Sequence, residues 1–248
     1  MKRNYWNTLQ FRTPWYFQDM ENQEHVLIGG TTGSGKSTVL NGLMLHLLQH
    51  SPSSAEFILI DPKGIELMDY EALPHTIRYA YSMDEINKSL ILANTIRKQR
   101  FDEMRRTGDK KYNGSHIYII IDEYACIGGK DGSASKEAMH SLKEIAFPGR
   151  ASNMHIIACT QRPTQDVIDG IIKNNFTVKV ALRCNDKQES RNIIGISGCE
   201  TFPKHGMAYY RTPSEAELQV IDTFPVPDDM MKRTLAHWRK EKYEVYGI

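Results

Sequence analysis

The chain has 248 residues and a formal net charge of +1, with 25% charged and 40% hydrophobic residues. That length suits one α/β domain with small additions, and the composition is ordinary for a soluble globular protein. The balanced charge excludes a uniformly basic nucleic-acid binder, so any contact with DNA has to come from a local cluster of cations.

The cysteines and the apolar runs bear on where the protein works. Cys126, Cys159, Cys184 and Cys199 form no C-x-x-C pair, and three of the four lie in apolar stretches where buried thiols are expected. No apolar run approaches the roughly 18 residues that cross a bilayer. The first six residues lack the apolar centre of a signal peptide. We therefore expect a cytoplasmic protein with no membrane segment in this chain.

Along the chain, apolar strand-like runs alternate with segments of helical periodicity. The runs predict strands at Val26–Ile28, Phe57–Ile60, Ile117–Ile121, His155–Cys159 and Val178–Leu182, and two later strands at 207–210 and 218–221. Helices are expected at 37–50, 84–106, 135–147, 165–175 and 228–243. Strands that alternate with helices predict an α/β fold, a mostly parallel sheet with helices on both faces and small C-terminal edge strands.

Two local patterns support these helices. Ser82, followed three residues later by Glu85, is typical of a capping box at the start of the long second helix. Met231, Leu235 and Trp238 are spaced to share one apolar face of the last helix. Both helices are therefore expected to be real elements of the fold.

Residues 30–37 read Gly-Thr-Thr-Gly-Ser-Gly-Lys-Ser, the G-x-x-x-x-G-K-[ST] spacing of a P-loop between an expected strand and an expected helix. Glycines let the backbone wrap a phosphate, and N–H groups at the helix start point toward it. Lys36 supplies charge for the β- and γ-phosphates, and the Ser37 hydroxyl binds Mg²⁺. The alternative is a Gly/Ser-rich turn before a helix. The residues expected to bind ATP are Gly30, Thr31, Thr32, Gly33, Ser34, Gly35, Lys36, Ser37 and Thr38.

The expected strand at 117–121 ends in Asp122 and Glu123. Asp122 can hold Mg²⁺ through water, and Glu123 can orient or deprotonate an attacking water. The alternative is the acidic start of a surface loop. Downstream of a P-loop, this pair favours a hydrolysing ATPase over a kinase, because a kinase has to exclude water from the phosphate.

Gln161, or Thr160 beside it, follows the expected strand at 155–159 and is a candidate to contact the γ-phosphate and the attacking water. The alternative is a polar strand end that leads into a turn at Pro163.

Several separated segments make the chain resemble the FtsK/SpoIIIE family of DNA-pumping motors, within the wider HerA/FtsK ATPases. They are the P-loop, D-P-K-G-I-E-L at 61–67, P-H at 74–75, I-D-E-Y-A at 121–125, G-R-A at 149–151, T-Q-R-P at 160–163, D-V-I to N-F at 166–176 and S-R at 190–191. They lie in the family's order across about residues 22–224. The resemblance implies a RecA-like P-loop NTPase that hydrolyses ATP with Mg²⁺ and translocates double-stranded DNA.

The resemblance also assigns a role to Arg150. It aligns with the arginine that reaches into the ATP site of a neighbouring subunit, where it stabilises charge on the γ-phosphate. Judged by its position alone, Arg150 is better explained as a cation near a helix C-terminus that interacts with the helix dipole. The role in a neighbouring site implies a homo-oligomer, a hexameric ring in this family.

Three further cations align with positions that face the pore of the ring. Arg162, Lys187 and Arg191 are implied to contact the DNA backbone, which positions DNA without reading its sequence. The alternative for each is a solvated surface charge. Lys63 and Glu66 are implied to lie near the nucleotide or a subunit interface, with a buried salt bridge as their alternative.

From these observations we expect an N-terminal arm at residues 1–20, a motor domain at 21–224 and a C-terminal helix at 225–248. The last part is too short for the winged helix of many family members, which suits a motor of a plasmid, conjugative element or phage. The alternative function is a type VII secretion-like ATPase that drives protein export. A nucleotide-gated binding module without translocation is a third possibility, which the intact Glu123 disfavours.

Overall fold

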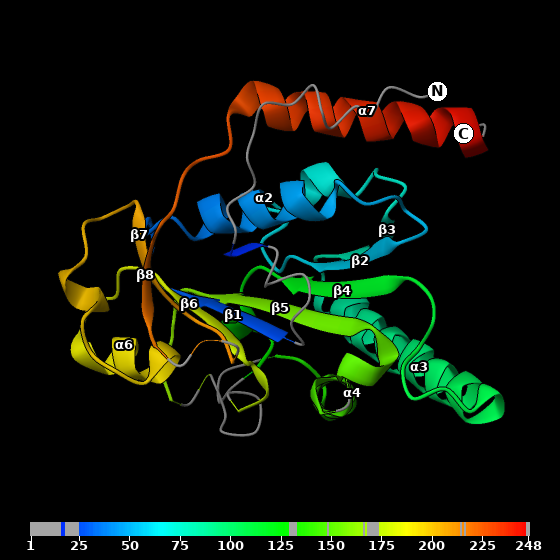
Figure 1. Ribbon diagram of the computed structural model, residues 1–248, viewed down its shortest axis with the longest axis horizontal. Helices are drawn as coiled ribbons and strands as arrows, with labels where there is room; N and C mark the ends of the chain where they lie inside the picture. The colour runs from blue at the N-terminus through cyan, green and yellow to red at the C-terminus, as the bar shows by residue number, and fades with distance from the viewer. Residues whose placement is uncertain are drawn as a thin grey trace.

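The computed structural model describes residues 16–17, 25–128, 133–147, 149–165, 167, 174–213, 215 and 217–246. In that part of the chain an eight-stranded sheet has the order β3-β2-β4-β5-β1-β6-β7-β8 (Figure 1). The strands are β1 (His25–Gly29), β2 (Ala55–Ile60), β3 (Thr76–Ala80), β4 (His116–Ile121), β5 (Met154–Thr160), β6 (Val178–Ala181), β7 (Met207–Arg211) and β8 (Gln219–Asp222). Neighbours from β3 to β6 are parallel, and β7 and β8 are antiparallel.

Helices cover both faces of this sheet. The described helices are α2 (Lys36–Leu47), α3 (Met83–Thr107), α4 (Lys136–Ala146), α6 (Lys187–Ile194) and α7 (Asp228–Tyr246), with short 3-10 helices η2 (Met68–Tyr70), η3 (Tyr124–Cys126), η4 (Gly149–Ser152) and η5 (Cys199–Thr201). In Figure 1, α2 and α7 lie above the sheet, and α3, α4 and α6 lie below it. The predicted α/β fold is confirmed. The C-terminal strand β8 forms one edge of the sheet, beside β7.

The central strands are buried on both faces, which explains their continuous apolar sequences. In β4, Tyr118 and Ile120 pack in the cluster on the α2 side, whereas Ile119 and Ile121 pack in the cluster on the α3 and α4 side. Burial of one such aliphatic side chain contributes about 1.5–3 kcal/mol. This two-sided core fixes the strand ends where the polar residues of the site begin.

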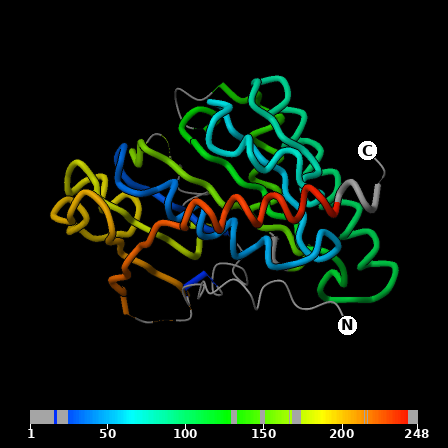
Figure 2. The backbone as a smooth tube through the Cα atoms, turned by 90° about the horizontal axis from the view of Figure 1, so that it is seen from above, coloured from blue at the N-terminus to red at the C-terminus, as the bar shows by residue number. Residues whose placement is uncertain are grey.

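The C-terminal helix shares the core with the sheet. The Trp238 indole N–H donates to the Leu48 carbonyl at 2.9 Å, and its ring meets the His75 ring edge-on at a centroid distance of 4.5 Å. Leu235 is buried in the same cluster. Both views place α7 over α2 (Figures 1 and 2). The predicted apolar face of this helix is therefore confirmed.

The expected N-terminal arm is described only at Tyr16 and Phe17, which are both buried. Their rings lie in the cluster on the α2 side of the sheet. Within the described residues, no helix combines the length and the apolar composition needed to cross a lipid bilayer. The division of the chain at residues 20 and 224 stays a proposal.

Two predictions about elements have different outcomes. The capping box is confirmed at the start of α3, because Ser82 Oγ accepts from the Glu85 N–H at 3.4 Å and Glu85 Oε2 accepts from the Ser82 N–H at 3.2 Å. Strand β3 was not expected. It lies at the sheet edge with most of its positions half-exposed, so its sequence has no continuous apolar run. The helix expected at 165–175 falls largely outside the described residues.

Candidate active site

The P-loop connects β1 to α2 and wraps the start of the helix. Gly33 and Gly35 have φ angles of +72° and +101°, a region that side chains with a Cβ atom rarely adopt. A Cβ atom at Gly30 would lie 2.7 Å from Ser34 Oγ and 2.8 Å from Leu182 Cβ. The loop lines a cleft of about 330 Å³. Glycine is therefore required at these three positions to form the cradle.

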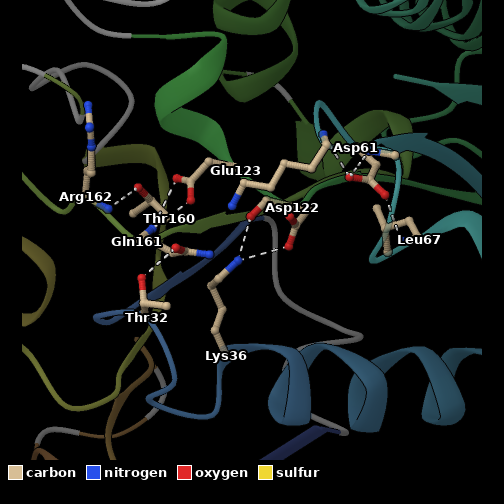
Figure 3. A network of polar contacts seen from close by, with 11 residues as sticks. Thr32, Lys36, Asp61, Leu67, Asp122, Glu123, Thr160, Gln161 and Arg162 are labelled. Atoms are coloured by element: carbon tan, nitrogen blue, oxygen red, sulfur yellow. Dashed lines mark hydrogen bonds and ion pairs between the residues drawn. The ribbon is translucent and has the colours of Figure 1, made fainter. Parts of the chain in front are cut away.

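Lys36, which lines this cleft, forms a buried ion pair with Asp122. Lys36 Nζ donates to Asp122 Oδ1 at 2.9 Å and to the Asp122 carbonyl at 3.0 Å (Figure 3). Burial by itself lowers the pKa of Lys36, whereas Cys159, Asp122 and Glu123 raise it, and the net result is a raised pKa. Because burial raises the pKa of Cys159 to about 12, that thiol is neutral at pH 7. The carboxylates therefore keep Lys36 charged.

One oxygen of this ion pair is left without a hydrogen bond. Asp122 Oδ2 is fully buried and has no partner among the described residues, and the same holds for Ser34 Oγ in the P-loop. Buried polar atoms are normally satisfied, so these two point to a ligand in the cleft. Ser37 lines the same cleft. A hydroxyl and a free carboxylate oxygen beside a P-loop fit the shell of Mg²⁺ bound with a nucleoside triphosphate.

Glu123 is held against the tip of the next strand. Its Oε1 and Oε2 accept from the Gln161 N–H at 3.1 and 3.2 Å. Gln161 Oε1 in turn accepts from Thr32 Oγ1 at 2.9 Å, so Gln161 lies between the P-loop and Glu123 (Figure 3). Thr160 is fully buried and its Oγ1 accepts from the Arg162 N–H. Of the two candidates at this tip, Gln161 is the one that lines the cleft.

The segment at 61–67 forms another wall of the site. The buried Asp61 carboxylate accepts from the N–H groups of Lys63, Gly64 and Leu67 at 3.2, 3.0 and 2.9 Å, which fixes the loop. Lys63 is exposed, so the alternative of a buried salt bridge with Glu66 is wrong.

Two adjoining cavities share part of this wall. Glu66 lines the nucleotide cleft. Lys63 lines a second cavity of about 480 Å³, together with Glu123 and Arg162. The two cavities have Thr31, Thr32 and Gln161 in common. Glu123 therefore faces the space that adjoins the end of the P-loop.

The three cations that the family resemblance assigns to DNA are all exposed. Arg162 follows β5, and Lys187 and Arg191 lie four residues apart on α6, where they share a face. Asn192 of α6 donates to the Pro163 carbonyl at 2.8 Å, so the helix is attached to the segment that carries Arg162. The fold thus brings the three cations to neighbouring elements.

Arg150 lies in η4, and its side chain is outside the described residues. Its position in the backbone is still informative. η4 comes directly before β5, whereas the P-loop follows β1, and these two strands run parallel side by side. Arg150 and the P-loop therefore lie at opposite ends of the same strand pair.

The loop between η5 and β7 contributes residues that the sequence analysis did not identify. His205 lines the nucleotide cleft, and Lys204 Cε lies 3.4 Å from the position of a Cβ atom on Gly33. No motif marks either residue, because the contact arises only when β7 pairs with β6 and returns the chain toward the P-loop.

Comparisons with known proteins agree with this geometry. A sequence profile of the FtsK/SpoIIIE family matches residues 8–116. A DNA translocase FtsK from Leptospira interrogans is 31% identical over 244 positions, which cover 90% of this chain and 25% of that protein. The chain thus spans about a quarter of the length of this curated relative.

Solved structures resemble the chain in fold. The conjugation coupling protein TcpA of pCW3, in its monomer form with ATPγS, has a TM-score of 0.75 and 24% identity over 88% of this chain and 66% of that chain. The cytoplasmic domain of the type VII secretion ATPase EccC from Thermomonospora curvata has a TM-score of 0.72 and 21% identity over 88% of this chain and 28% of that chain. These likenesses show a RecA-like P-loop ATPase fold. From its sequence relatives and its P-loop site, the chain belongs to the FtsK/SpoIIIE family.

Proposed function

We propose that this chain is an ATP-hydrolysing motor that translocates double-stranded DNA as a ring of identical subunits. The observation that carries the proposal is the arrangement at the carboxyl ends of β1, β4 and β5, where Lys36 of the nucleotide cleft is paired with Asp122 and Glu123 lines the adjoining cavity. The name of the Leptospira relative, a DNA translocase, supports DNA as the substrate.

Each residue of the site has a separate role in ATP hydrolysis. On nucleotide binding, Lys36 leaves Asp122 and neutralises the β- and γ-phosphates, while P-loop N–H groups hold the β-phosphate. Ser37 and Asp122 would hold Mg²⁺, which when bound would supply charge that offsets the phosphate oxygens. Glu123 orients the attacking water and accepts its proton, and Gln161 contacts the same water or the γ-phosphate. Glu123 is in a position for this role because it lines the 480 Å³ cavity that adjoins the P-loop.

The remaining residues connect hydrolysis with DNA. Arg162, Lys187 and Arg191 contact phosphates of a duplex in the pore, which suits a motor that has to move along any sequence. Arg150 acts in the site of the neighbouring subunit, since the P-loop of its own subunit lies at the other end of the strands. This arrangement requires a homo-oligomer, which we propose is hexameric. We further propose a cytoplasmic setting and a plasmid, conjugative or phage DNA as the cargo.

The test is the ATPase rate of the chain alone, with duplex DNA, with single-stranded DNA and with an unfolded polypeptide. Duplex DNA is expected to raise the rate by about fivefold or more, the lower range of typical coupling between two sites. The Lys36→Ala variant gives the background, because it lacks the charge that holds the phosphates. Stimulation by polypeptide and not by duplex DNA would instead support a motor for protein export.

A further inference from the structure

Helix α6 carries two of the three cations that we assign to DNA. Hydrogen bonds connect it with the segment after β5 and, through Asn185, with the P-loop. Lys187 and Arg191 are exposed on one face of this helix. The residues that attach α6 to the site, Asn192 and Asn185, lie in no motif used above. The helix therefore connects the proposed DNA surface with the residues of the ATP site.

The first attachment runs through Asn192, which is only 6% exposed. Its Nδ2 donates to the Pro163 carbonyl at 2.8 Å, and its Oδ1 accepts from Gln188 Nε2 at 3.0 Å. Pro163 is buried and lies two residues beyond Gln161. Because proline has a fixed φ angle, the chain between these two residues has few soft torsions. The hydrogen bond of Asn192 and this short segment therefore connect α6 with Gln161.

At the other end of this short segment, the Gln161 N–H contacts both oxygens of Glu123, at 3.1 and 3.2 Å. Figure 3 shows Glu123 turned toward this strand tip, with Arg162 following directly on the chain. The same N–H group that holds Glu123 is thus flanked by one of the cations assigned to DNA. The segment 160–163 therefore holds the Glu123 carboxylate through a backbone N–H group.

The second attachment runs through Asn185, at the entrance to α6. Asn185 Oδ1 accepts from Thr31 Oγ1 of the P-loop at 3.0 Å. Glu189 of α6 fixes Asn185 by accepting from its backbone N–H at 2.8 Å and from its Nδ2 at 3.1 Å. The helix is thereby joined to the P-loop as well as to the segment that holds Glu123.

We propose that α6 is the coupling element through which duplex DNA controls ATP hydrolysis, with Asn192 as its main positioning residue. Phosphates bound by Lys187, Arg191 and Arg162 shift α6 relative to the sheet, and Asn192 carries that shift to Gln161 and releases Glu123 toward the attacking water. The inference rests on the proposed function and adds the route by which DNA acts on the site.

The test compares Asn192→Ala with Asn94→Ala, a matched control. Asn94 is an asparagine on α3 that is 5% exposed, and its Oδ1 accepts from Arg97 Nε at 2.8 Å. ATP turnover is measured at saturating ATP with and without saturating duplex DNA, and the Kd for a labelled duplex is measured by fluorescence anisotropy. For Asn192→Ala, the basal rate and the DNA Kd are expected to stay within about twofold, while stimulation falls by about fivefold or more. Asn94→Ala is expected to keep normal stimulation.

A second variant keeps the test valid if Asn192→Ala does not fold. Asn192→Leu retains the approximate size of the side chain without burying a charge, and it has no donor for the Pro163 carbonyl. It is expected to lose stimulation in the same way. Thermal unfolding of each variant identifies a chain that has lost its fold.

Several results would overturn the coupling role. Normal stimulation in a folded Asn192 variant contradicts it, and so does an equal loss of basal and stimulated rates. A loss that disappears at higher DNA concentration would place Asn192 in DNA binding instead. If duplex DNA fails to stimulate the unmodified chain, the proposed function itself is wrong. The proposed coupling role of α6 is then wrong as well.

Discussion

At the scale of single residues, Lys36 and Glu123 have different tasks, and they line two adjoining cavities. Lys36 is buried with its charge compensated by Asp122, so it is ready to meet a phosphate. Glu123 contacts a backbone N–H and lines the adjoining cavity. Binding and hydrolysis should therefore be separable by mutation.

The Glu123→Gln variant should bind ATP and fail to hydrolyse it. Glutamine keeps the shape and can still accept from the Gln161 N–H, but it cannot take a proton from water. Loss of a general base typically lowers the rate by about 10²–10⁴-fold. Phosphate release measures the loss, and a fluorescent ATP analogue measures the retained affinity. Unchanged phosphate release in this variant would contradict the catalytic role.

His25 predicts a pH dependence of stability. Its Nε2 donates to the Ala146 carbonyl at 3.0 Å and its Nδ1 accepts from the Ile156 N–H at 2.9 Å, which requires the neutral ring. Burial lowers the pKa of His25 to about 4, and the Ala146 hydrogen bond opposes this only in part. Because the folded pKa lies below the unfolded value of 6.5, the stabilisation is complete above pH 6.5 and is lost as the pH falls through 4.

Urea unfolding at several pH values tests this linkage. The free energy of unfolding should fall between pH 6.5 and pH 4, with about 3 kcal/mol of the loss due to His25 at about 1.4 kcal/mol per pKa unit. A His25→Gln variant should show a shallower slope. His75, whose pKa burial also lowers to about 4, still contributes to the slope in that variant. Identical slopes in both proteins would contradict the assignment.

At the scale of elements, α6 and the tip of β5 form the proposed DNA surface. The double variant Arg162→Ala and Lys187→Ala should lose DNA-stimulated ATPase and keep the basal rate, because both side chains are exposed and neither has a proposed role in hydrolysis. The slope of log affinity against log salt should shrink by about 0.9 for each phosphate contact removed.

A matched pair of exposed cations provides the control for this variant. Lys98→Ala with Arg106→Ala removes the same charge from α3 and should leave the salt dependence of DNA binding unchanged. An equal loss of basal and stimulated rates in the α6 and β5 variant would mean that its residues serve the nucleotide site instead.

The elements also show what a sequence can predict. Strands β1, β4 and β5 were predicted because burial on both faces makes their sequences continuously apolar. In a parallel sheet their carboxyl ends meet at one edge, so the proximity of the P-loop, Asp122 and Gln161 was also predictable. Strand β3 was not, since an exposed edge strand leaves no such pattern.

Long-range contacts explain the rest of what the sequence could not predict. His205 reaches the cleft only because β7 returns antiparallel to β6. Asn192 contacts Pro163 across 29 positions of sequence, and no local pattern marks a single hydrogen bond between a helix and a strand tip. Residues of this kind are defined by packing and not by a motif.

At the scale of the whole molecule, the proposed ring interface uses opposite ends of the strands in the two subunits that meet. The cleft lies at the carboxyl ends of the strands, and η4 with Arg150 lies at the amino end of β5. A contact that joins these unlike ends is repeated around a closed ring. Hydrolysis would then need two subunits for each site.

Mixing two inactive variants tests this shared site. Arg150→Ala leaves an intact cleft without the arginine of its neighbour, and Lys36→Ala leaves an intact Arg150. Each alone should be nearly inactive, and a mixture should recover part of the ATPase rate, because a Lys36→Ala subunit can supply Arg150 to an intact cleft. A mixture no more active than its parts, or an active Arg150→Ala variant, would contradict a shared site.

The central claim is movement along double-stranded DNA, and displacement of a labelled third strand from a duplex measures it most directly. With ATP, the unmodified chain should release the third strand, and the Glu123→Gln variant should not. Release that requires free duplex on one side of the triplex would show movement from that side. ATP hydrolysis stimulated by duplex DNA without any release of the third strand would contradict translocation.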